Sequence, residues 1–186
     1  EQNVLQWYYS NIGNIYADQK NYRKGLEYSF KAITVEERVN DKRALSVTLS
    51  NIGGIYSSME INDSALYYYI RSLKMAEEMK DTFAIALSLT NSAVMYVKLK
   101  RYDSGYELAK KGYKMSLDKG IGDIIIYNLK TLGDIELSKK NYESAEKYYL
   151  KAAELSAKMK AQLLIRDSYL SLATLYNCTQ KPKTLC

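Results

Sequence analysis

The amino-acid sequence predicts an all-α fold, a right-handed α-solenoid of about nine helices stacked as antiparallel pairs. Three observations predict it: a 40-residue repeat without insertions or deletions, a single proline in 186 residues, and apolar residues at helical spacing. Each interior proline costs a helix about 3 kcal/mol, so its scarcity is typical of long helices. Repeats of roughly 20–50 residues are typical of solenoids, in which each repeat packs on its neighbours.

The repeat is visible in small residues that recur every 40 positions. The first series is Gly13, Gly53, Ala93, Gly133 and Ala173, the second is Gly25, Ala65, Gly105 and Ala145, and the third is Ala32, Ser72, Gly112 and Ala152. Glycine inside a helix costs about 1 kcal/mol relative to alanine. We therefore expect the two helices of a pair to cross with their backbones nearly touching at these positions.

Each 40-residue cycle consists of two predicted helices. Residues 42–58 are typical of the first helix and residues 142–159 of the second, and each range has an apolar stripe at helical spacing. Short polar breaks separate the helices, and Asp41, Asp81 and Asp123 are the predicted N-caps. We expect one solenoid over 1–178 with repeats at about 5–41, 42–81, 82–121 and 122–161, a final half repeat at 162–177, and a flexible tail at 179–186.

Composition argues against most catalytic and cofactor chemistry. The chain has no histidine, which excludes His-based triads and His-ligated zinc sites. Cys178 and Cys186 are too few for a disulfide framework. We expect no enzyme activity, no cofactor and no metal. No apolar run approaches the ~20 residues of a membrane span. The net charge of +6 and the 19 tyrosines do not favour nucleic-acid binding, because most tyrosines occupy core positions of the repeat.

The repeat resembles the tetratricopeptide pattern, W-x-x-L-G-x-x-Y followed by A-x-x-x-F and then P. In the second cycle the matching residues are Leu49, Ile52, Gly53, Tyr56 and, in the next helix, Ala65-x-x-x-Tyr69. The resemblance covers about residues 5–177. The chain departs from the family in its period, 40 residues instead of about 34, and in lacking the closing proline. This predicts that the second helix continues about one turn further, as in the tetratricopeptide regions of bacterial signalling regulators.

The resemblance implies a concave groove, lined by the first helix of each pair, that binds an extended or helical peptide. The expected lining residues are Trp7, Val47, Leu87 and Tyr127; Ser10, Ser50, Thr90 and Lys130; Asn11, Asn51 and Asn91; and Asn14, Val94 and Asp134. Family members use an asparagine like Asn11, Asn51 and Asn91 to hold a peptide backbone. The alternative is that these amides bond locally. Lys130 is the only basic residue among these expected lining residues, which argues against a clamp for a terminal carboxylate.

These features predict a non-catalytic protein- or peptide-binding scaffold. The chain opens on Glu1 rather than methionine, which indicates a processed or excised piece, and we expect the sensor or adaptor part of a larger signalling protein. The alternative is a structural assembly module that forms a homodimer through its terminal helices. A cytoplasmic location is favoured over the bacterial periplasm.

Overall fold

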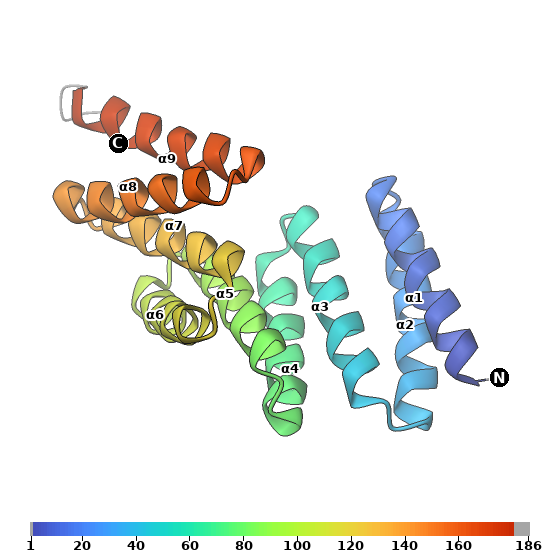
Figure 1. Ribbon diagram of the computed structural model, residues 1–186. Helices are drawn as coiled ribbons and strands as arrows, with labels where there is room; N and C mark the ends of the chain where they lie inside the picture. The colour runs from blue at the N-terminus through green and yellow to red at the C-terminus, as the bar shows by residue number, and fades with distance from the viewer. Residues whose placement is uncertain (1, 181–186) are drawn as a thin grey trace. The chain divides into compact units, whose positions relative to one another are not determined.

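The structure is a computed structural model that describes residues 2–180, with side chains from Val4 to Thr179 (Figure 1). Nine α-helices and no strands occupy this part of the chain. They are α1 (Gln2–Asp18), α2 (Tyr22–Arg38), α3 (Lys42–Ser58), α4 (Asn62–Met79), α5 (Thr82–Lys98), α6 (Tyr102–Lys119), α7 (Gly122–Ser138), α8 (Tyr142–Lys158) and α9 (Gln162–Gln180). The predicted all-α fold is confirmed. The last helix extends three residues beyond its predicted end, and the predicted tail from 181 onward, with Cys186, lies outside the described residues.

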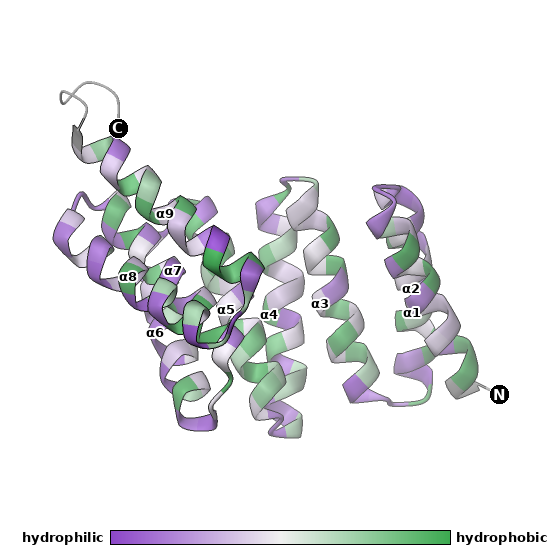
Figure 2. Cartoon of the chain, turned by 45° about the horizontal axis from the view of Figure 1, so that its top comes forward, coloured by the Kyte–Doolittle hydropathy of each residue, from purple (hydrophilic) through white to green (hydrophobic). Residues whose placement is uncertain are grey.

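The chain divides into two compact units, Glu1–Met95 and Tyr96–Cys186. In the first unit α1 pairs with α2 and α3 with α4, and α2 packs on α3. In the second unit α7 packs on both α6 and α8, and α8 packs on α9. The first helices of neighbouring pairs also meet, α1 with α3 and α7 with α9. Hydrophilic and hydrophobic residues alternate around each helix, as expected when one stripe is buried against the neighbours (Figure 2).

The same turn closes every helix from α1 to α8. A residue with φ between 54° and 67° ends each one, at positions 20, 40, 60, 80, 100, 120, 140 and 160. The backbone N–H of the next residue donates to the carbonyl five residues back, as in Asn21 to Tyr16 (2.8 Å) and Ile121 to Ser116 (2.9 Å). This is the bond of a Schellman motif, which ends a helix without proline.

The turn accounts for the long period. Each helix with its turn occupies 20 residues, so the added length belongs to both helices of a repeat. The added length is therefore not confined to the second helix, because the left-handed turn ends first and second helices alike.

Two of the three predicted N-caps are correct. The Asp41 and Asp81 carboxylates accept the N–H groups of Ala44 (3.0 Å) and Ala84 (3.1 Å). The third prediction was wrong, because α7 begins at Gly122 with Ile121 at its N-cap. Asp123 lies two residues past the capping position and falls inside the first turn of the helix.

The left-handed turn residues give the first testable prediction. A left-handed conformation costs an L-residue roughly 1–2 kcal/mol, and glycine's greater unfolded-state entropy offsets part of that. Lys140 has φ 62°, whereas Gly120 has φ 67° with open space around it. We expect Lys140→Gly to raise the free energy of unfolding by up to about 1 kcal/mol and Gly120→Ala to lower it by about as much. Urea denaturation would measure both, and changes of the same sign would contradict this account of the turn.

The glycines mark two kinds of helix crossing. In the first pair, a Cβ on Gly13 would lie 3.1 Å from the Gly25 carbonyl oxygen, so the predicted backbone contact is confirmed there. In the second pair, a Cβ on Gly53 would lie 2.8 Å from ring carbons of Tyr69. Gly133 faces the Tyr149 ring in the same way. The difference arises in the second helix, because the first pair has a serine at position 29 where the second and fourth have tyrosines.

Candidate functional site

Two hollows lie along α1 and α3 in the first unit, and both contain residues of the predicted rows. The tryptophan hollow, of about 330 Å³, is lined by Gln6, Trp7, Ser10, Glu36, Asp41, Arg43, Ala44, Val47 and Thr48. The asparagine hollow, of about 460 Å³, is lined by Asn14, Ala17, Asp18, Tyr22, Ser50, Asn51, Gly54, Ile55 and Ser58. The first borders the early turns of α1 and α3 and the second their later turns. The structure therefore brings Trp7, Ser10 and Val47 together at one hollow and Asn14, Ser50 and Asn51 at the other.

The asparagine hollow offers hydrogen-bonding groups from both helices. Asn14 and Asn51 are half-buried, and each amide has one acceptor oxygen and two N–H donors. A peptide backbone needs both a donor and an acceptor, so such amides suit an extended segment of any sequence. Asn11 uses one N–H locally, to the Trp7 carbonyl at 2.8 Å. Its amide oxygen and second N–H are not used in that bond.

The tryptophan hollow has an apolar rim and a polar floor. Trp7 and Val47 are 62% and 53% exposed, whereas Glu36 is 1% exposed. Thr48 donates its hydroxyl to Glu36 Oε1 at 2.7 Å. Burial, reinforced by the negative charges of Asp41 and Glu37, raises the pKa of Glu36 to about 7 although the Thr48 bond opposes it.

The polar floor of the tryptophan hollow is absent from the sequence-based set of site residues. Neither Gln6 nor Glu36 was predicted, because only the exposed face of the first helices was considered. A signal for Glu36 exists in the repeat. The equivalent positions are Ala76, Ser116 and Ser156, so a glutamate stands where the other cycles have a small residue.

Two of the predicted residues of α5, Leu87 and Thr90, lie deeper than their equivalents on α1 and α3. Leu87, Asn91 and Val94 are half-buried. Thr90 is only 3% exposed, and its hydroxyl donates to the Ala86 carbonyl at 2.8 Å. Of the four, Asn91 offers the polar side chain that best suits a peptide.

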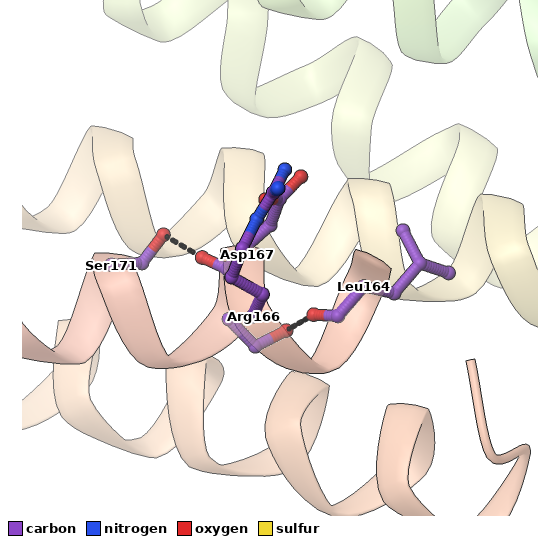
Figure 3. Close-up of polar contacts among 5 residues, drawn as sticks. Leu164, Arg166, Asp167 and Ser171 are labelled. Carbon is purple, nitrogen blue, oxygen red and sulfur yellow. Dashed lines mark hydrogen bonds and ion pairs between the residues drawn. The ribbon is translucent and has the colours of Figure 1, made fainter. Parts of the chain in front are cut away.

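The second unit has a hollow of about 270 Å³, and its two carboxylates already have partners. It is lined by Lys130, Asp134, Leu137, Tyr149, Asp167, Leu170, Ser171 and Thr174. The Tyr149 hydroxyl donates to Asp134 at 2.6 Å, and burial raises the pKa of Tyr149. Arg166 donates to Asp167, and Ser171 donates to the Asp167 carbonyl on the same helix (Figure 3). Tyr127, also predicted, is 45% exposed on α7.

Between Gln2 and Gln180, no helix combines the length and the apolar character that a bilayer span requires.

Comparison with known proteins identifies the repeat. Residues 4–78 match the tetratricopeptide repeat family. No curated protein matches the chain in sequence.

Solved structures extend the fold assignment to the whole described chain. The STAND protein with a tetratricopeptide repeat sensor from Pyrococcus horikoshii is 20% identical with a TM-score of 0.84, over 97% of this chain and 28% of its own. The apo form of RapI is 19% identical with a TM-score of 0.77, over 94% of this chain and 54% of its own.

A third structure is a complex. The Rap conjugation gene regulator of plasmid pLS20 with the Phr* peptide is 13% identical with a TM-score of 0.68, over 94% of this chain and 53% of its own. The chain thus spans about a quarter to a half of these proteins. These identities establish the fold alone. The chain carries tetratricopeptide repeats over residues 4–78, and its described length has the tetratricopeptide-repeat fold.

Proposed function

We propose that this chain is a non-catalytic scaffold that binds an extended peptide segment along α1, α3 and the part of α5 that belongs to its first unit. One observation carries the proposal: side chains predicted from the repeat line two successive hollows on α1 and α3. Apolar side chains at one hollow and amides at the other match what a peptide presents, namely side chains and a hydrogen-bonding backbone. Asn11 and Asn91 extend the amide series beyond the hollows.

We further propose that the scaffold is the sensor or adaptor part of a larger signalling protein. Two observations support this role. The structurally similar pLS20 regulator is in complex with the Phr* peptide, and the similar STAND protein has a tetratricopeptide repeat sensor. The chain spans only 28% of that STAND protein, so an output activity would reside in other domains.

The experiment is selection of peptides from a random-sequence displayed library on the purified chain, followed by affinity measurement on variants. We expect Asn51→Ala with Asn91→Ala to weaken the binding of the selected peptides at least about fivefold, because each lost backbone hydrogen bond in a partly buried site is worth about 0.5–1.5 kcal/mol. The matched control is Asn177→Ala, an exposed helical asparagine in the second unit. Unchanged affinity in the double variant, with thermal unfolding also unchanged, would refute this groove.

A second candidate function is self-assembly through the terminal helices. The observation that favours it is the exposed apolar surface of α9, where Leu163, Tyr169 and Leu170 are 68%, 59% and 58% exposed. Exposed apolar patches on soluble proteins commonly mark interaction surfaces. Analytical ultracentrifugation separates the two functions, since a chain that stays monomeric at high concentration is not an assembly module.

A further inference from the structure

Two buried acceptor atoms, which belong to residues that line the tryptophan hollow, have no hydrogen-bond donor. They are Glu36 Oε2 and Gln6 Oε1. Both residues line the hollow, and they are only 1% and 8% exposed. A buried polar atom without a partner costs about 1–3 kcal/mol, so such atoms in a concave site call for an explanation.

Three donors near these atoms are already committed. Gln6 Nε2 donates to Asp41 Oδ2 at 2.8 Å, and the backbone N–H of Ala44 donates to Asp41 Oδ1 at 3.0 Å. The Thr48 hydroxyl donates to Glu36 Oε1 at 2.7 Å. Turning the Gln6 amide over would place its oxygen against the Asp41 carboxylate, so the hydrogen bonding fixes the amide as it stands. These three bonds leave Glu36 Oε2 and Gln6 Oε1 unpaired.

We propose that the tryptophan hollow binds a guanidinium group, donated by an arginine side chain of the bound peptide. A guanidinium has five N–H donors in a plane and no acceptor, which complements one carboxylate oxygen and one amide oxygen. Trp7 at the rim supplies an aromatic face on which a planar cation stacks. The attribution to a peptide rests on the proposed function; binding of the guanidinium itself does not.

The charges around the hollow agree with a cationic ligand. Asp41 is part of its lining, and both Asp41 and Glu37 act on the Glu36 carboxyl as negative charges. Arg43 is the one base in the lining, but its side chain is 78% exposed and its Nη2 lies 3.7 Å from Asp81 Oδ2. Arg43 therefore points to another carboxylate. Since Glu36 titrates near pH 7, its carboxylate is available to a cation in mildly alkaline solution.

The test uses the fluorescence of Trp7, the only tryptophan in the chain. The full chain is titrated at pH 8 with butylguanidinium and, separately, with neutral butylurea, while circular dichroism verifies that the helices stay folded. We expect a saturable fluorescence change with butylguanidinium and at least tenfold weaker binding of butylurea. Glu36→Gln should weaken butylguanidinium binding at least tenfold. The matched control Glu107→Gln removes an exposed carboxylate on α6 in the second unit and should bind like the wild type.

Equal affinity in Glu36→Gln and wild type, or no saturable response in the folded wild type, would overturn the proposal. The outcome is separable from that of the proposed function. If butylguanidinium binding depends on Glu36 but the affinity of the selected peptides does not depend on Asn51 and Asn91, the guanidinium site is supported and the peptide groove is refuted. If peptide affinity depends on Asn51 and Asn91 but exchanging each peptide arginine for citrulline changes that affinity less than threefold, the peptide groove is supported and its arginine site is refuted.

Discussion

Gly53→Ala is expected to lower the free energy of unfolding by about 1–3 kcal/mol, whereas the same change at the adjacent Gly54 raises it by about 1 kcal/mol. A Cβ on Gly53 would lie 2.8 Å from ring carbons of Tyr69, which is 7% exposed and cannot move aside. A Cβ on Gly54 would come no closer than 3.7 Å, to the Tyr69 hydroxyl oxygen. Gly54→Ala therefore raises helix propensity without introducing a steric clash.

Urea denaturation followed by circular dichroism measures both variants. Each is the other's control, because both add one methyl group to the middle of α3. A destabilising effect of similar size at both positions would show that helix α3 tolerates neither substitution for reasons unrelated to Tyr69. A neutral Gly53→Ala would contradict the close contact between α3 and α4.

Glu36→Gln is expected to stabilise the protein at pH 8 by up to about 3 kcal/mol and to have little effect near pH 4.5. The pKa of Glu36 is raised from 4.5 in its unperturbed state to about 7 in the fold. Between these values the folded protein holds a proton that the unfolded chain has released. The free energy of unfolding therefore falls as the pH rises from about 4.5 to 7, and the whole loss is present above pH 7. Glutamine has no proton to lose.

The measurement is the free energy of unfolding of wild type and variant from pH 4.5 to 8. Other carboxyl groups, such as Glu27 and Glu78, have lowered pKa values and give the opposite slope, but they are common to both proteins and cancel in the difference. A constant difference for Glu36→Gln would show that the carboxyl is not desolvated in the fold.

The repeat was enough to predict the helices, because the small and apolar residues that define them recur at a fixed spacing. Where a position departs from the repeat, local packing determines which groups it contacts. Gly53 was expected to meet a backbone, but Tyr69 on the paired helix fills the space. Asp123 was expected to cap a helix because aspartate favours that role, but the 20-residue register of the turns puts Ile121 at the cap.

The turns show a limit of composition-based reasoning. Left-handed residues are usually glycine, yet seven of the eight here are lysine, asparagine or glutamate. No residue type identifies them, and only their spacing does. The floor of the tryptophan hollow was missed for a different reason. Glu36 lies on a second helix, whereas the predicted site residues all lie on first helices.

The central claim, that a peptide binds along α1, α3 and α5, is tested most directly by NMR of the asparagine side-chain amides. A library-selected peptide is added to isotopically labelled protein, and the shifts of all side-chain NH₂ groups are followed. The account predicts that the largest shifts come from Asn51, Asn14 and Asn91, with smaller changes at Asn177 on α9. Shifts confined to amides of the second helices, such as Asn62 on α4, would contradict it and place the peptide on another face of the repeats.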